Sequence, residues 1–286
     1  MVVFPNCKIN LGLRITGKRA DGYHNLETVF IPIPLRDALE ILPASDANLS
    51  NPIAYRQSGN KIDGNDLDNI CIKAYQLLKL DFPSLPPIQL HLHKEIPIGA
   101  GLGGGSADGA FTLKLLNEQF NLHLSTEQLI QYALKLGSDC PFFIINTPCY
   151  ATGRGEILSP IVLNIAGYTI VVINPGIHIN TGQAFTQLKK QIELSNHINN
   201  KNIPLIKDIL LQDIYTWKTT LFNDFEFAAF GQFPVLKAIK ATLYKQGAVY
   251  AAMSGSGSTM FGIFEASEKP IIEMPNNYFV NQLAFA

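Results

Sequence analysis

The feature that most constrains this chain is a glycine-rich segment that runs directly into a helical pattern. Five glycines lie within the seven residues 99–105, and residues 106–120 then place apolar side chains at helical spacing. Glycine lets backbone amides turn inward and lets a ligand come close. The first turn of the following helix adds unpaired N–H groups and the positive end of its dipole. The segment therefore predicts a cradle for a phosphate rather than a flexible linker, with Ser106 adding a hydroxyl or capping the helix.

Other nucleotide-binding loops match these residues less well. No Gly-Lys-Ser/Thr closes the segment, so it is not a Walker A loop. The GxGxxG spacing of dinucleotide folds is present, but the preceding strand pattern is not continuously apolar, as that fold requires. The acidic residue expected about 20 positions on would be Glu118, which falls inside the helical pattern. No His-Arg-Asp or Asp-Phe-Gly follows, which excludes a protein kinase.

Composition adds limits on partners and location. The 286 residues are 47% hydrophobic and 16% charged, which is typical of a globular protein. The formal net charge of −1 gives no basic field, so we expect a small-molecule substrate and no nucleic acid or membrane partner. Residues 1–10 lack a signal-peptide pattern and no run of about 18 apolar residues occurs, which predicts the cytoplasm. A monomer or homodimer is expected.

The four cysteines form no CxxC pair, and no known motif places a histidine beside one of them. Free, buried thiols are favoured over zinc, redox or nucleophilic chemistry for Cys7, Cys71, Cys140 and Cys149. No metal ligand is assigned.

The N-terminal segment shows a clear strand pattern. Apolar and polar residues alternate strictly over residues 8–15, which predicts a strand with one apolar face. Because alternate residues share a face, Lys8 and Asn10 lie side by side on the polar face.

Helical and strand patterns then follow one another along the chain. Helices are predicted at residues 69–80, 106–120, 125–137, 184–194, 205–211 and 236–245. Asp68 or Asn69 could cap the first of these, and Ser125 with Gln128 fits a capping box at the start of the third. Strands are predicted at residues 28–42, with breaks at Pro32 and Pro34, and at 88–93, 168–173, 248–253 and 259–264, and residues 196–202 form a polar loop. This mixture predicts the α+β class with a domain boundary near residue 155.

Three short motifs together resemble one kinase family. The sequence Pro97-x-Gly99-x-Gly101-Leu102-Gly103-Gly104-Gly105-Ser106 is similar to the phosphate loop of the GHMP kinases, which include galacto-, homoserine, mevalonate and phosphomevalonate kinases. The family's two other motifs resemble Lys8-Ile9-Asn10-Leu11 and Met253-Ser254-Gly255-Ser256-Gly257-Ser258. Three motifs in the right order are far more specific than one.

The resemblance implies the two-lobed GHMP kinase fold. Residues 1–155 would form a ribosomal-S5-domain-2-like, ATP-binding lobe, and residues 156–286 a ferredoxin-like, substrate-binding lobe. ATP and the substrate would meet between the lobes. Magnesium is expected because it arrives with ATP, and no protein ligand is assigned to it.

Two further segments resemble one branch of this family. Residues 19–28 (RADGYHNLET) and 136–143 (LGSDCPFF) are similar to the branch that phosphorylates the 2-hydroxyl of a methylerythritol bearing a cytidine diphosphate, in the non-mevalonate route to isoprenoid precursors. A homoserine- or mevalonate-type kinase and a non-catalytic nucleotide-binding module are the alternatives. Ala107 departs from the family, which usually has a second serine at that position.

The resemblance assigns the chemistry to a carboxylate and an ammonium group. Asp139 would be the catalytic carboxylate at the acceptor hydroxyl, as base or orienting group, and the alternative role is a helix N-cap. Lys8 would lie beside Asp139, favour its ionised form and steady charge on the transferred group. Asn10 would hydrogen-bond the substrate or Asp139.

The same resemblance assigns the binding residues. Tyr23 and Phe185 would sandwich cytosine and His24 would read its edge, with a turn tyrosine and a core phenylalanine as alternatives. Further substrate-binding residues would be Thr181, Gly255, Ser256 and Gly257, the last three otherwise forming a structural turn. The ATP-binding residues would be Pro97, Gly99, Gly101, Leu102, Gly103, Gly104, Gly105 and Ser106 at the phosphates, with Asn69 and Lys94 at adenine.

Overall fold

A computed structural model of the chain describes residues 1–44, 52–195 and 204–285. The chain divides into two compact units, each discontinuous in sequence. The first comprises Met1–Cys7, Leu35–Ile98 and Gly103–Thr147, and the second Lys8–Pro34, Gly99–Leu102 and Pro148–Ala286. The glycine-rich segment therefore contributes to both units. The predicted division of function at residue 155 stays a prediction.

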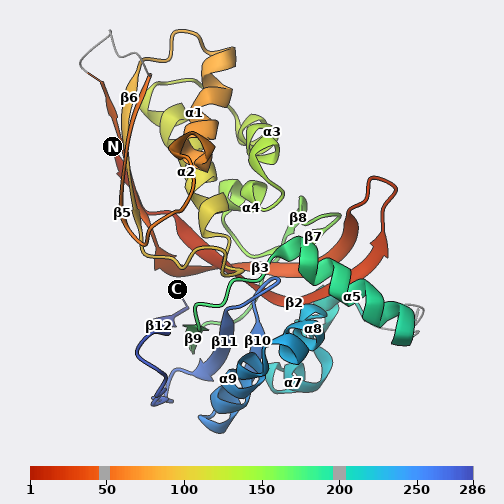
Figure 1. Cartoon of the computed structure of the whole chain (residues 1–286). Helices are drawn as coiled ribbons and strands as arrows, with labels where there is room; N and C mark the ends of the chain where they lie inside the picture. The colour runs from red at the N-terminus through yellow and green to blue at the C-terminus, as the bar shows by residue number, and fades with distance from the viewer. Residues whose placement is uncertain (45–51, 196–203, 286) are drawn as a thin grey trace. The chain divides into compact units, whose positions relative to one another are not determined.

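The first unit contains a four-stranded sheet with helices on one of its faces (Figure 1). The strand order is β1 (Val2–Val3), β4 (Ala38–Pro43), β6 (Ile88–Lys94) and β5 (Ile53–Gly59). β5 and β6 are parallel, and the chain between them forms α1 (Ile70–Asp81), as a parallel crossover requires. The other helices are α2 (Gly104–Gln119), α3 (Thr126–Leu136) and α4 (Cys140–Ile145), and a 3₁₀ turn spans Asp66–Asp68.

Local capping signals predicted two of these helices correctly. Asn69 is the N-cap of α1, where its side chain accepts a bond from the Cys71 amide. Ser125 and Gln128 form the predicted capping box of α3, which ends before Gly137. Helix α2 begins two residues earlier than predicted, so glycines 104 and 105 lie in its first turn.

A second sheet has the order β2 (Asn6–Lys18), β3 (His24–Arg36), β7 (Cys149–Thr152) and β8 (Ile157–Pro160). The predicted first strand is confirmed, and residues 6–13 are buried on both of its faces. The expected breaks at Pro32 and Pro34 are wrong, since β3 runs through both prolines. β7 pairs with β3 only at residues 28–30, so both prolines lie beyond that ladder, where a missing N–H is tolerated.

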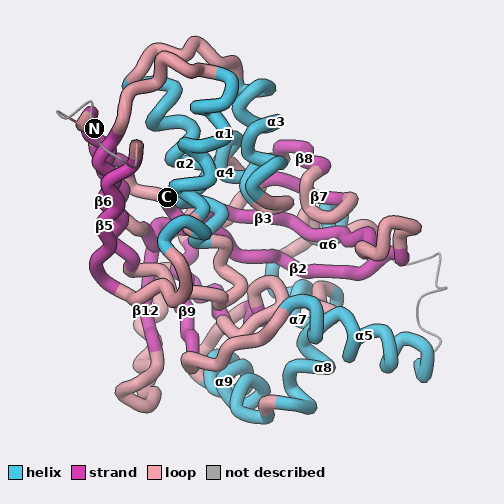
Figure 2. Tube along the Cα trace, turned by 45° about the horizontal axis from the view of Figure 1, so that its top comes forward, coloured by secondary structure: helices cyan, strands magenta, loops and turns pink. Residues whose placement is uncertain are grey.

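The third sheet is antiparallel and belongs to the second unit. Its order is β10 (Tyr250–Met253), β11 (Met260–Glu265), β9 (Tyr168–Asn174) and β12 (Phe279–Ala284). The helices are α5 (Thr181–Ser195), α6 (Ile206–Ile209), α7 (Trp217–Thr220), α8 (Phe225–Gln232) and α9 (Pro234–Lys245), with a 3₁₀ turn at Ile214–Thr216 (Figure 2). Phe225 of α8, Leu236 of α9 and Met253 of β10 share one core cluster. The predicted polar loop at 196–202 lies outside the described residues.

The mixture of sheets and helices agrees with the predicted α+β class. All four cysteines are buried thiols outside any disulfide, as predicted. Over the residues that the structure describes, no helix has the length and apolar character to cross a membrane.

Candidate active site

The polar face of β2 is a buried hydrogen-bond network. Lys8 and Asn10 are only 4% and 2% exposed, and the Lys8 Nζ donates to Asn10 Oδ1 at 2.7 Å. The Asn10 amide donates to the Thr28 hydroxyl at 3.0 Å, which in turn donates to the Gly12 carbonyl at 2.5 Å. The Lys8 Nζ also lies 4.8 Å from the centre of the Phe30 ring. These contacts fix the directions of both predicted side chains.

The three family motifs meet around Gly101 within the second unit. From β2, the Lys8 amide donates to the Leu102 carbonyl at 2.9 Å, and the Lys8 Nζ lies 3.4 Å from the Gly101 carbonyl oxygen. From the C-terminal motif, the Ser254 hydroxyl donates to that same carbonyl at 2.9 Å. Gly101 has a φ of 80°, and a Cβ there would lie 2.1 Å from the Ser254 carbonyl oxygen. Any larger residue would push the two loops apart.

Asn223, which the sequence did not reveal, holds the C-terminal loop. Its side-chain amide donates to the carbonyls of Met253 and Gly255, at 2.8 Å each. Its backbone forms an isolated parallel β-bridge with Leu13 of β2. This asparagine therefore ties the C-terminal motif to the N-terminal strand. It stands alone between apolar and acidic residues, so no motif or periodicity could have found it.

The first turn of α2 is built to receive an anion. Its N-cap, Gly103, has a left-handed φ of 70° and no side chain to cap the helix. The amides of residues 104–106 lie at the start of the helix, where α-helical bonding provides no acceptor. A Cβ on Gly104 would lie 2.8 Å from the Ile96 Cγ2, so glycine lets the helix begin close to β6. These features fit the phosphate groups of ATP.

Ser106 links this turn to the segment that carries Asp139. The Ser106 hydroxyl hydrogen-bonds the Cys140 thiol, and burial raises the pKa of that thiol to about 12. Cys140 directly follows Asp139, so the carboxylate lies one residue from a contact with the first turn of α2. Ser106 does not cap the helix with its side chain, since Gly103 occupies the N-cap.

Asp139 occupies the N-cap position of α4. Its backbone is helical, with φ −85° and ψ −16°, and its side chain makes no capping bond. A capping aspartate instead has an extended backbone and accepts an amide bond from the helix. The half-buried Asp139 side chain therefore makes no capping bond, and its catalytic role stays a prediction.

The residues expected at cytidine make ring contacts with other side chains of the chain. The Phe185 ring stacks on His24, with centroids 4.7 Å apart and planes 9° apart, and it also meets Phe225 edge-on at 4.9 Å. Tyr23 is 55% exposed, and the Arg154 guanidinium lies 4.8 Å from its ring centre. The three predicted side chains come from β3, α5 and the turn before β3. The cytosine sandwich by Tyr23 and Phe185 stays a prediction.

Two other predicted substrate contacts lie side by side. The hydroxyls of Thr181, at the start of α5, and Ser256 are 3.0 Å apart. Gly255 and Gly257 have φ values of 58° and 92°, which favour glycine. The turn therefore has a structural reason for its glycines, and its substrate contacts stay predictions.

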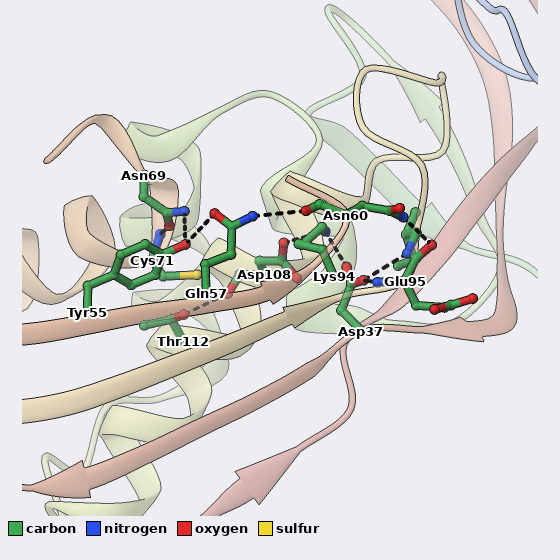
Figure 3. Close-up of polar contacts among 11 residues, drawn as sticks. Asp37, Tyr55, Gln57, Asn60, Asn69, Cys71, Lys94, Glu95, Asp108 and Thr112 are labelled. Atoms are coloured by element: carbon green, nitrogen blue, oxygen red, sulfur yellow. Dashed lines mark hydrogen bonds and ion pairs between the residues drawn. The ribbon is translucent and has the colours of Figure 1, made fainter. Parts of the chain in front are cut away.

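The residues expected at adenine belong to a polar network in the first unit (Figure 3). Asn69 caps α1 and its Nδ2 donates to the Tyr55 hydroxyl at 2.8 Å. Lys94 is 2% exposed, and its Nζ pairs with Asp37 and Asp108. Neither carboxylate was predicted from the sequence. The alternation of β6 could have indicated them. Its next step places Lys94 on the buried face, where the ammonium group needs a counter-charge.

Comparison with known proteins places this geometry in a family. The family model of the GHMP kinases N-terminal domain matches residues 69–147, and the model of the GHMP kinases C-terminal domain matches residues 205–281. The 4-diphosphocytidyl-2-C-methyl-D-erythritol kinase of Bacteroides fragilis is 52% identical over 269 residues, which cover 94% of each chain. That of Cytophaga hutchinsonii is 48% identical over 278 residues, or 97% of each chain.

Solved structures agree with these matches. The crystal structure of a 4-(cytidine 5'-diphospho)-2C-methyl-D-erythritol kinase superposes with a TM-score of 0.78 and 27% identity, over 100% of both chains. The mevalonate kinase of Methanococcus jannaschii has a TM-score of 0.72 over 100% of this chain and 98% of its own, but only 15% identity, so it shares the fold alone.

The chain therefore belongs to the GHMP kinases and, within them, to the family of the 4-diphosphocytidyl-2-C-methyl-D-erythritol kinases. The predicted family and GHMP kinase fold are confirmed, and so is the predicted class of enzyme, a small-molecule kinase. Membership of a kinase family implies the use of ATP. The roles assigned to single site residues stay predictions.

Proposed function

We propose that this chain transfers the γ-phosphoryl group of ATP to the 2-hydroxyl of 4-diphosphocytidyl-2-C-methyl-D-erythritol. A bond forms between the substrate oxygen and the γ-phosphorus, and the bond from that phosphorus to the bridging oxygen of ADP breaks. The hydroxyl proton passes to Asp139 or to solvent. The observation that carries the proposal is the meeting of three kinase motifs around Gly101. The relatives that bear this activity in their names support the choice of substrate.

The phosphates of ATP would bind the backbone amides of the glycine-rich segment and the first turn of α2. The Ser106 hydroxyl, which hydrogen-bonds the Cys140 thiol, would add a bond to a phosphate at the same turn. Magnesium bound to ATP would neutralise charge on the phosphate oxygens. In the part of the chain that the structure describes, no three His, Cys, Asp or Glu side chains gather into a metal site, and we assign no protein ligand to magnesium.

Asp139, Lys8 and Asn10 would handle the acceptor hydroxyl. Asp139 would orient this hydroxyl or accept its proton, and the Lys8 ammonium would offset negative charge on the transferred group. Asn10 fixes the Lys8 ammonium through a 2.7 Å bond, which keeps that charge in one place. Such positioning is the main protein contribution in phosphoryl transfer.

The cytidine end of the substrate would bind Tyr23, His24 and Phe185. Stacking on an aromatic ring contributes roughly 1–3 kcal/mol per base. The exposed Tyr23 ring offers such a surface, and His24 is already stacked on Phe185. Thr181 and Ser256 would contact the phosphate groups of the substrate through their adjacent hydroxyls.

We further propose that the enzyme works in the cytoplasm as a monomer or homodimer. Its formal net charge of −1 gives no general attraction for nucleic acid or for anionic membranes.

The test is ADP release in a coupled assay against a panel of alcohols. We expect turnover with the cytidine-diphosphate alcohol and none with free methylerythritol, homoserine or mevalonate. Asp139→Asn should lower kcat on the order of 10²–10⁴-fold. Asp63→Asn, an exposed carboxylate in a surface pair with Lys61, is the matched control and should keep wild-type activity. Turnover with homoserine or mevalonate alone would refute the proposed substrate.

A further inference from the structure

A buried cluster of three charged side chains lies at the end of β6 (Figure 3). The Lys94 Nζ donates to Asp37 Oδ2 and, at 2.7 Å, to Asp108 Oδ2. Asp37 comes from the turn between β3 and β4, and its Oδ1 accepts the amides of Glu95 at 2.7 Å and Ile96 at 2.9 Å. Asp37 therefore uses both oxygens as acceptors, which is the pattern of an ionised carboxylate.

This cluster lies directly behind the first turn of α2. A Cβ on Gly104, the first residue of the helix, would lie 3.4 Å from the Lys94 Nζ. Asp108 is four residues further along the same helix, about one turn in. The charges of the cluster therefore act on the backbone amides that we propose to hold the phosphates of ATP.

The charge balance of the cluster depends on Asp108. If both carboxylates were ionised, one ammonium would face two of them and the buried cluster would carry a net charge of −1. The Asp108 Oδ1 has no hydrogen-bond partner among the described residues. Burial raises the pKa of Asp108 to about 8, with Lys94 opposing that rise and Asp37 adding to it. Burial lowers the pKa of Lys94, but the two carboxylates outweigh it and the net pKa is raised.

The other titratable groups facing Asp108 do not change charge near neutral pH. Burial raises the pKa of the Cys71 thiol on α1 above its usual range. Burial likewise raises the pKa of Tyr55 on β5. Thr112, one turn along α2, donates its hydroxyl to the Asp108 carbonyl at 2.7 Å and carries no charge. The charge change of this cluster between pH 7 and pH 9 therefore falls on Asp108.

We propose that Asp108 is a positioning residue for ATP: as a neutral carboxylic acid it holds Lys94 behind the first turn of α2 without placing a net negative charge there. Ionised Asp108 makes the cluster negative and repels the phosphates across a short, poorly screened distance. ATP binding and protonation of Asp108 consequently favour each other. This inference rests on the proposed function, because it takes the first turn of α2 as the phosphate site.

Calorimetric titration of MgATP into the whole protein at pH 7.0 and pH 9.0 tests this inference. A terminal phosphate with a pKa of about 6 is already about nine-tenths ionised at pH 7.0, so its own titration changes little over this range. We expect the Kd of the wild type to rise about fivefold between the two pH values, as a shift of one pKa unit on binding would give for a group with a pKa of about 8. The isosteric variant Asp108→Asn is always neutral, so its Kd should change less than about twofold. Glu118→Gln, at the exposed far end of α2, should keep the wild-type pH dependence.

A second measurement needs no variant and guards against misfolding. Binding heats in buffers of different ionisation enthalpy give the protons taken up with ATP, and at pH 8 we expect on the order of half a proton. A purely structural role for Asp108 would give neither proton uptake nor a pH-dependent Kd.

The outcomes separate this inference from the proposed function. ATP binding that is equally tight at both pH values, or Asp108→Asn with the wild-type pH dependence, overturns the role of Asp108 alone. Absence of ATP binding at pH 7.0 overturns the proposed function and this inference together.

Discussion

Lys8 and Lys94 are both buried lysines on strands, but their surroundings differ. Lys8 lies on the polar face of β2 and donates to Asn10, two residues along the chain, and to the Gly101 carbonyl. Lys94 extends the apolar face of β6 and lies between two carboxylates, 57 and 14 residues away in sequence. A lysine on an apolar face needs counter-charges from elsewhere in the fold. The comparison predicts that Lys94 stabilises its unit, whereas Lys8 acts in phosphoryl transfer.

The largest effect that would test this difference is on stability. Lys94→Met should lower the free energy of unfolding by about 3–5 kcal/mol, because it leaves two buried carboxyl groups without their partner. Urea unfolding measures this loss. Lys61→Met, whose ammonium is 86% exposed beside Asp63, should change stability by no more than about 1 kcal/mol. A loss below 1 kcal/mol for Lys94→Met would show that the cluster is not structural.

Lys8→Met should lower activity more than stability. We expect kcat to fall on the order of 10²–10³-fold, since the variant removes the charge that we propose to act on the transferred group. Stability should fall by only about 1–2 kcal/mol, for the lost bond to Asn10. Steady-state kinetics and urea unfolding on the same preparation separate the two effects. Equal stability losses for both lysine variants, with activity following the folded fraction, would break the comparison.

A smaller effect concerns the pH dependence of stability. Because the pKa of Asp108 rises from 3.8 to about 8 on folding, the folded chain holds a proton that the unfolded chain releases. The stability that this group contributes is present below pH 4 and is lost as the pH rises through 8. Between pH 6 and pH 8, the free energy of unfolding of the wild type should therefore fall by roughly 1–3 kcal/mol more than that of Asp108→Asn.

Urea unfolding of both chains at the two pH values gives this difference directly. All other titratable groups are shared, so their contributions cancel. Parallel pH dependence of the two chains would mean that Asp108 is ionised in the folded state.

Local signals predicted much of the fold. Asn69 and the Ser125–Gln128 box each specify a helix start through a side-chain bond to a nearby amide, and alternation over residues 88–93 specified β6. The strand breaks predicted at Pro32 and Pro34 were wrong because a proline interrupts a strand only where its missing N–H would bond a neighbouring strand. Helix α8 was missed because its sequence, FEFAAFGQ, is apolar almost all round and has no amphipathic period.

In the candidate site, too, the sequence indicated some residues and missed others. Lys8, Asn10 and the glycine-rich segment lie in contiguous motifs, so the sequence could indicate them. Asp37, Asp108 and Asn223 act through contacts between distant segments, and each stands outside any motif. Ala107, which replaces the usual serine, is fully buried, so a methyl group packs where a hydroxyl would need a partner.

The most direct test of the central claim is a ³¹P NMR spectrum of the reaction of ATP, magnesium and 4-diphosphocytidyl-2-C-methyl-D-erythritol with this protein. A new phosphomonoester signal should grow in step with ADP while the cytidine diphosphate signals remain, and it should grow about 10²–10⁴-fold more slowly with Asp139→Asn. Growth of inorganic phosphate in place of that ester, or an unchanged spectrum with folded protein, would contradict the account.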